Sequence, residues 1–277
     1  MTAALLALLS SVLWGSADYL GGVLSRTRAA IQVVALSQAI SLVVVGLAVV
    51  LTGAAIGSTA VVWGMLAGLA GGTALICFYA ALAAGTMGVV APISALGLVV
   101  PVLAGLLAGE RPSVLQLIGI AVAVAGVVLA SGPELSGGAS ARPLLLAATA
   151  GFGFGFTLLF LAQSDDTLPT LAMMRVASVG LLSVVLLALW RTTGVPVRIN
   201  VRAAPALGFV GIADLGANGL YAVAATSGLL SVVAVLASLY PAVTVILAWR
   251  FGRERLGGLQ QAGVGAALVG VVLLAAG

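Results

Sequence analysis

The chain has 277 residues, of which 62% are hydrophobic and only 6% are charged, and its mean hydropathy is +1.31. This composition excludes a soluble globular domain and is typical of a polytopic membrane protein. The net charge of +4 indicates no nucleic-acid partner, because the arginines cluster in short connections between apolar stretches. The sequence contains no histidine and one cysteine, Cys77. We therefore expect no disulfide within the chain, no metal site and no cofactor.

Apolar stretches and turn residues divide the chain into ten candidate spans. A hydrocarbon core about 30 Å thick requires about 20 helical residues per crossing, so the length allows ten helices with short connections. The first stretch lacks a basic leader segment and is long enough to span, which predicts an uncleaved first helix. We predict an all-α, multi-pass membrane protein with spans at residues 3–24, 31–51, 61–83, 87–108, 113–130, 143–163, 169–190, 203–227, 229–249 and 256–276.

The two halves of the chain repeat one another. Glu110-Arg111 matches Glu254-Arg255, and Leu115-Gln116 matches Leu259-Gln260 at the same offset. The stretch 131–142, rich in Gly, Ser and Pro, separates the halves, so we predict five-helix repeats at 1–135 and 136–277. Because five is odd, the second repeat enters the membrane from the opposite side, and the repeats are expected to be inverted. Such symmetry is typical of transporters that expose one central site alternately to each side.

Arginines are unevenly distributed between the two sets of connections. Connections after even-numbered spans contain one arginine, Arg111, together with Asp165 and Asp166, whereas connections after odd-numbered spans contain nine arginines. The positive-inside rule then predicts that both termini lie outside the cytoplasm. Connections after odd-numbered spans contain Arg26, Arg28, Arg142, Arg191, Arg198, Arg202, Arg250, Arg253 and Arg255.

The span at 203–227 carries three polar residues near its middle. Asp214, Asn218 and Tyr221 follow the helical spacing i, i+4, i+7 and so share one face. A carboxylate at the centre of a spanning helix costs about 2.5–3.5 kcal/mol and normally faces a water-filled cavity or a partner inside the bundle. The pattern favours a substrate-binding cavity at this face, and the alternative is a structural hydrogen bond from Asp214 to the backbone of a neighbouring helix.

Further candidates for the binding site come from other spans. Asp18 follows Trp14 by one helical turn, and Tyr79 and Tyr221 fall at nearly matching positions of the two halves. Tyr240 precedes a proline inside the ninth span. Low dielectric favours the protonated form of a carboxyl group, so Asp214 and Asp18 are candidates for proton coupling. Either carboxylate could instead bind an ammonium group on the cargo.

Three kinds of residue predict how the helices are shaped and packed. Arg175 either extends along the helix to the membrane surface or binds a carboxylate. Prolines inside the fourth and ninth spans remove a backbone hydrogen bond and are expected to kink those helices. Glycine pairs one turn apart predict close helix packing. The pairs are Gly64 and Gly68, Gly68 and Gly72, Gly105 and Gly109, and Gly151 and Gly155.

Several short motifs resemble those of the EamA family in the drug/metabolite transporter superfamily. They are Trp14-Gly15-Ser16, Gly109-Glu110-Arg111, Arg253-Glu254-Arg255, and a Leu-Gln-x-x-Gly sequence beginning at Leu115 and again at Leu259. The resemblance covers essentially the whole chain. It implies ten helices in two inverted five-helix repeats, and a central cavity lined chiefly by the third, fourth, eighth and ninth helices.

The chain departs from the family pattern in two places. The second span has Gln32 and Gln38 where an arginine is usual, whereas Arg175 fits the pattern in the seventh span. Family members also usually have both termini in the cytoplasm, opposite to what the arginine distribution predicts. The resemblance therefore leaves the orientation open.

These observations predict an inner-membrane exporter of small amphipathic metabolites, such as amino acids, that works by alternating access. Its expected partners are a small-molecule substrate, the lipid bilayer and a coupling proton, and the chain is expected to act as a monomer or homodimer. The alternatives are a channel-like facilitator and a non-transporting membrane scaffold. An enzyme is not expected, because neither Asp18 nor Asp214 lies in the Gly-x-Gly-Asp setting of intramembrane aspartyl proteases.

Overall fold

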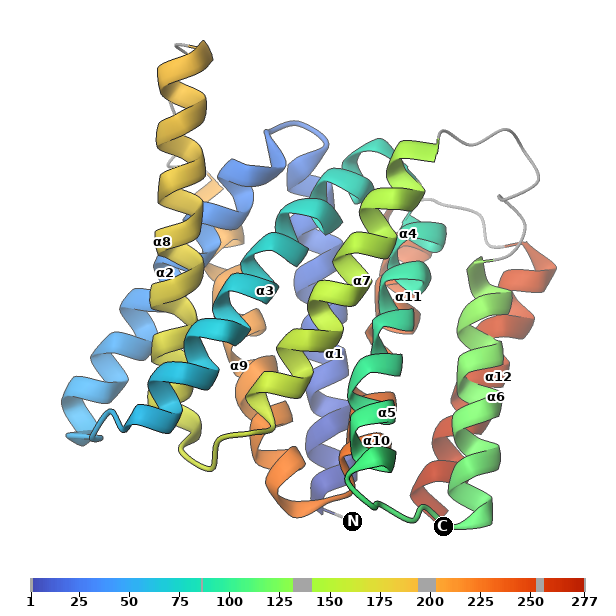
Figure 1. Ribbon diagram of the computed structural model, residues 1–277. Helices are drawn as coiled ribbons and strands as arrows, with labels where there is room; N and C mark the ends of the chain where they lie inside the picture. The colour runs from blue at the N-terminus through green and yellow to red at the C-terminus, as the bar shows by residue number, and fades with distance from the viewer. Residues whose placement is uncertain (1, 86, 132–140, 194–202, 253–256, 277) are drawn as a thin grey trace.

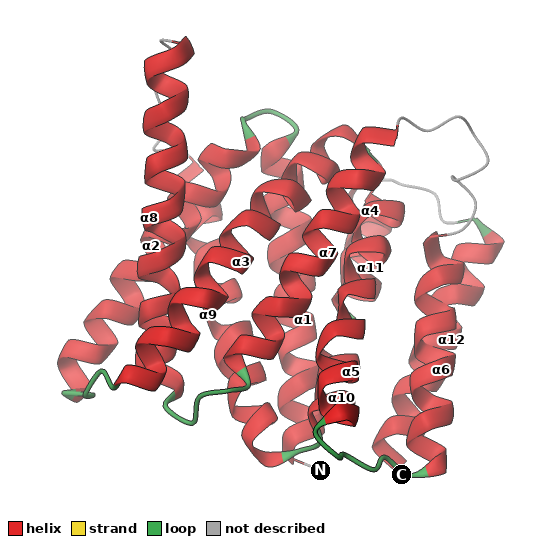
Figure 2. Ribbon diagram, viewed as in Figure 1, coloured by secondary structure: helices red, strands yellow, loops and turns green. Residues whose placement is uncertain are grey.

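The computed structural model describes residues 2–85, 87–131, 141–193, 203–252 and 257–276 (Figure 1). Every regular element in these ranges is a helix (Figure 2), which confirms the predicted all-helical fold. The α-helices are α1 (Thr2–Ser25), α2 (Ala30–Thr52), α3 (Ser58–Ala84), α4 (Met87–Ala95), α5 (Val99–Leu107), α6 (Val114–Ser131), α7 (Ala141–Leu161), α8 (Thr167–Thr193), α9 (Ala204–Ser227), α10 (Leu230–Ala237), α11 (Tyr240–Gly252) and α12 (Gly258–Ala276).

The helices are long and apolar enough for a multi-pass membrane protein. Among the described residues, seven segments can cross a membrane by length and composition: α1, α2, α3, α7, α8, α9 and the continuous stretch Leu230–Gly252. Two shorter apolar segments, Ile93–Leu107 and Val114–Gly126, fall in the predicted fourth and fifth spans. The chain is therefore a multi-pass membrane protein, and the count of ten spans stays a prediction.

Helices at corresponding places in the two halves pack against corresponding partners. The third span, α3, packs on α7 of the second half, and the eighth, α9, packs on α1 of the first half. In the same way α3 contacts α8, and α9 contacts α2. Helices α6 and α12 pack mainly on one another and lie side by side at one flank of the bundle (Figure 1). Helix α1 begins and α12 ends at the same end of the bundle.

The predicted fourth and ninth spans are each broken near the middle. A 3₁₀ turn at Leu96–Leu98 separates α4 from α5, and Ser238 and Leu239 separate α10 from α11. Prolines stand just after both breaks: Pro101 lies in the first turn of α5 and Pro241 is the second residue of α11. A proline costs least there, because the first amides of a helix have no intrahelical partner. Pro101 and Pro241 thus stand beside local departures from α-helical geometry, whereas Pro92 lies inside α4.

Glycines allow several of these helices to touch through their backbones. A Cβ on Gly64 or Gly68 of α3 would overlap the backbone of α8 at Thr170 or Met174. Gly151 and Gly155 of α7 meet the broken fourth span in the same way, so these pairs act as predicted. Gly109 is different: it has a φ of 94° and forms a turn, with no neighbouring atom close to where a Cβ would stand. Its prediction as a packing residue was wrong.

Glu110 connects the two halves at one end of the bundle. Its carboxylate accepts hydrogen bonds from the backbone amides of Leu230 (2.6 Å) and Ser231 (3.0 Å). These amides belong to the first turn of α10, where a negative charge is favourable and no side chain of the flanking Leu229 acts as a cap. The repeated glutamate of the other half, Glu254, lies outside the described residues.

Candidate functional site

A cavity lies among the middle parts of helices from both halves of the chain. It comprises about 570 Å³ of space between side chains, counting the part that is open to the surroundings. Most of its wall is apolar, and it holds both predicted intramembrane acids. The lining residues are Trp14, Asp18, Gly71, Leu75, Ser94, Phe154, Thr157, Leu158, Met174, Asp214, Asn218, Ser238 and Tyr240.

Asp214 is the centre of a hydrogen-bond network in this wall. Its Oδ1 accepts bonds from the indole N–H of Trp14 (3.1 Å) and from the amide of Asn218 (3.1 Å). Its Oδ2 accepts a bond from the amide of Gln38 (3.0 Å) and lies 2.8 Å from Nη2 of Arg175, as an ion pair. The carboxylate thus joins α1, α2, α8 and α9, and its charge is balanced by a cation.

Arg175 is completely buried, with none of its surface exposed. Besides the ion pair with Asp214, its Nη1 donates a hydrogen bond to Oε1 of Gln38 (2.6 Å), an oxygen that also accepts a bond from the hydroxyl of Ser178 (3.1 Å). Of the two alternatives for this arginine, the structure therefore selects the carboxylate and excludes extension to the surface. A buried charge of this kind is tolerated only when it is paired.

Asp18 has a different environment from Asp214. Only 6% of its surface is exposed, yet in the described part of the chain no side chain or backbone amide donates a hydrogen bond to it and no arginine forms an ion pair with it. It lines the cavity beside Trp14, one turn away on α1. A buried carboxylate normally has partners. Asp18 is therefore an acid of the cavity wall without a hydrogen-bond or ion-pair partner among the described residues.

The sequence profile described as the EamA-like transporter family matches the chain twice, over residues 1–132 and 141–276. The chain belongs to the EamA-like transporter family. One solved crystal structure, described only as that of a protein, has 20% identity to it and a TM-score of 0.72, and the match covers 98% of this chain and 95% of the other. At that identity the likeness establishes a shared fold alone. No curated protein sequence matches significantly.

Two of the family motifs have a structural explanation in this EamA-like protein. Gly15, of Trp14-Gly15-Ser16, lets α1 approach α11 closely, because a Cβ there would stand 2.6 Å from the carbonyl oxygen of Tyr240. The hydroxyl of Thr244 donates to the Gly15 carbonyl across the same contact (3.2 Å). The second motif, Gly109-Glu110-Arg111, supplies the carboxylate that caps α10.

The cavity of this EamA-like protein extends beyond the helices that the resemblance implies. The third, fourth, eighth and ninth spans contribute to it, as expected. The first span adds Trp14 and Asp18, the seventh adds Met174, and the sixth adds Phe154, Thr157 and Leu158. Both halves therefore contribute aromatic surface to the wall.

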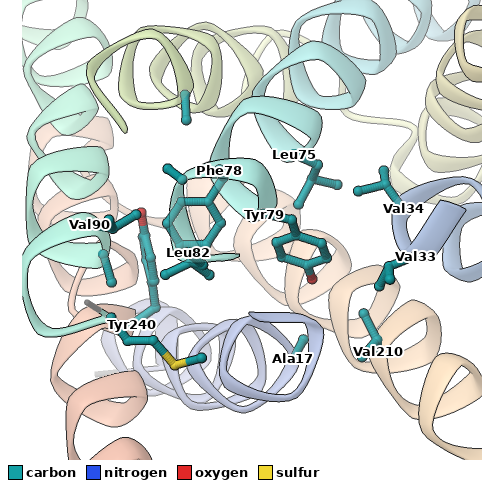
Figure 3. Close-up of a cluster of buried hydrophobic side chains, with 14 of the residues drawn as sticks. Ala17, Val33, Val34, Leu75, Phe78, Tyr79, Leu82, Val90, Val210 and Tyr240 are labelled. Carbon is teal, nitrogen blue, oxygen red and sulfur yellow. The ribbon is translucent and has the colours of Figure 1, made fainter. Parts of the chain in front are cut away.

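Five of the seven residues predicted for the site line the cavity, and two tyrosines do not. Trp14, Asp18, Asp214, Asn218 and Tyr240 are in the wall. Tyr221 is buried against Trp14, with ring centroids 6.0 Å apart, and Tyr79 packs on Gly21 of α1. Figure 3 shows the hydroxyl of Tyr79 directed toward Ala17 and Val210, whereas Phe78 and Tyr240 lie close together. Tyr79 and Tyr221 thus pack between helices behind the cavity wall.

Two polar residues, Gln38 and Ser178, belong to the network although no pattern in the sequence predicted their contribution. Gln38 is 1% exposed and bridges Arg175 to Asp214. It stands in the second span, where an arginine is usual in the family. A glutamine inside a span is itself a signal of a polar partner, but the identity of that partner depends on which helices become neighbours.

Proposed function

We propose that this protein is a carrier that exports small amphipathic metabolites by alternating access, with ten spans in two inverted repeats. The observation that carries the proposal is a cavity lined by both halves of the chain, next to the interruptions of the fourth and ninth spans. Discontinuous helices at corresponding positions of two repeats are typical of transporter binding sites. Matched packing of the two halves supports inverted symmetry, which a channel or scaffold does not require.

An orientation with the termini outside the cytoplasm accompanies this proposal. Arg26 and Arg28 follow α1, and Arg191 and Arg250 stand in the last turns of α8 and α11, all at one end of the bundle, whereas Arg111 follows α5 at the opposite end. Asp165 and Asp166 lie at the opposite end, between α7 and α8, together with both termini. The positive-inside rule then predicts that the arginine-rich end faces the cytoplasm, in a bacterial-type inner membrane.

Asp18 is the better candidate of the two acids for coupling to a proton. Asp214 is held by Arg175 and three hydrogen-bond donors, so its protonation would leave the arginine without its counter-ion. Asp18 has no such partner among the described residues, and its protonation would break no ion pair. A proton and a cargo could therefore occupy this carboxylate in turn.

Flux in proteoliposomes tests this proposal. A panel of labelled amino acids and amines would be offered with and without an imposed pH gradient. We expect saturable, gradient-driven flux in the wild-type protein and in the surface control Asp165→Asn, and at least about 10-fold less gradient-driven flux in Asp18→Asn. Unsaturable flux that ignores the gradient would instead establish a channel-like facilitator, and absence of flux for every solute would favour a scaffold.

A further inference from the structure

We propose that the cavity selects a monovalent organic cation with an aromatic or apolar body, and that Asp18 binds its cationic group. The inference rests on the proposed carrier function and specifies the chemical class of the cargo. Such a cation differs from the zwitterionic amino acids expected from the sequence. The difference follows from the balance of charges in the cavity wall.

The charged side chains that line the cavity are both acidic. Asp18 and Asp214 are in the wall, whereas the one buried arginine of the described ranges, Arg175, lies behind it. Arg175 balances Asp214 through the 2.8 Å ion pair. One uncompensated carboxylate, that of Asp18, therefore faces the cavity. In a site of low dielectric this excess charge attracts a single positive charge much more strongly than it would in water.

Aromatic and apolar side chains line the same cavity as this carboxylate. Trp14 stands one turn from Asp18 on α1, and Phe154 and Tyr240 complete the aromatic part of the wall. Leu75, Leu158 and Met174 supply the apolar part. Aromatic faces attract alkylammonium groups in addition to packing against apolar bodies, particularly where the site is desolvated. The wall thus suits both ends of an amphipathic cation.

A cargo carboxylate would find no cationic partner among the residues that line the cavity, only neutral donors such as the hydroxyl of Tyr240. Arg175 is fully buried and is not among the residues that line the cavity, and its Nη1 and Nη2 face Gln38 and Asp214. The start of α11 is a weak anion site, because Pro241 has no N–H and the amide of Ala242 donates to the carbonyl of Leu239. A zwitterion would therefore bury its carboxylate beside two acids, which costs affinity.

Three probes share one aromatic group and differ in charge: cationic 2-phenylethylammonium, neutral 2-phenylethanol and zwitterionic phenylalanine. Isothermal titration calorimetry on the purified full-length protein in detergent would measure the binding affinity of each probe. We expect the ammonium to bind at least about 10-fold more tightly than the alcohol or phenylalanine. Asp18→Asn, nearly the same in shape, should remove this preference, and Asp165→Asn should retain it. Thermal unfolding of both variants checks that the fold is intact.

Several outcomes would overturn the inference. Phenylalanine binding as tightly as the ammonium would refute it, as would an unchanged preference in folded Asp18→Asn or no binding of any probe. Its failure is distinguishable from failure of the carrier function. Saturable flux of phenylalanine without ammonium binding refutes the cation site alone, whereas Asp18-dependent ammonium binding supports the cation site even in a protein that moves no solute across liposomes.

Discussion

Arg175→Met is expected to destabilise the protein by about 3–5 kcal/mol, the usual cost of removing one partner from a buried ion pair. The substitution retains an apolar side chain of similar length but leaves the carboxylate of Asp214 without a cation, and it removes the donor that holds Gln38. Equilibrium unfolding in mixed micelles of mild detergent and sodium dodecyl sulfate measures the change.

Arg191→Met is the matched control for this prediction. Arg191 stands in the last turn of the same helix and is exposed, so its replacement should change stability by less than about 1 kcal/mol. The double variant Arg175→Met with Asp214→Asn should recover part of the loss, because no unpaired charge remains. If Arg175→Met were no more destabilising than Arg191→Met, the ion pair would not have the structural role assigned to it.

Gly97→Ala is expected to cost about 1–3 kcal/mol of stability, as overpacking does in well-filled interiors. Gly97 belongs to the 3₁₀ turn that interrupts the fourth span, and a Cβ there would overlap the carbonyl oxygen of Gly151 on α7. The obstacle is backbone, so no side-chain rotation relieves it. The same unfolding assay measures the loss, and α7 must move away from the break to accommodate the methyl group.

Gly46→Ala provides the control for the glycine prediction. Gly46 lies inside α2, and a Cβ there would meet no atom within 4 Å. Alanine is also the better helix former, so this substitution should be neutral or slightly stabilising. Equal losses for the two variants would mean that the contact between Gly97 and Gly151 is not a tight one.

Hydropathy and helical spacing predicted much of this fold. The apolar stretches mark helices within a few residues, because a crossing needs a minimum length of apolar chain. The spacing of Asp214 and Asn218 correctly places both in one wall, since residues four apart share a helix face. These features depend only on local sequence, and a single chain is sufficient to find them.

Contacts between distant spans were beyond the reach of the sequence. Arg175 could be assigned to the surface or to a carboxylate, and only the packing of α8 on α2 and α9 decides for Asp214. Pro241 predicted a kink in the ninth span, but hydropathy did not locate the break at Ser238 and Leu239, because a break inside an apolar stretch leaves the hydropathy unchanged. The sequence favoured Asp214 over Asp18 for its central depth in the span, yet Asp214 has a cationic partner and Asp18 has none in the described residues.

Counterflow tests most directly the central claim, that one cavity carries an organic cation alternately to each side of the membrane. Proteoliposomes would be loaded with unlabelled N,N,N-trimethyl-2-phenylethylammonium, which cannot cross lipid as a neutral amine, and diluted into a trace of the labelled compound. An alternating carrier predicts transient accumulation of label inside above its external concentration, lost in Asp18→Asn. A monotonic rise to equilibrium, or no entry of label, would contradict the account.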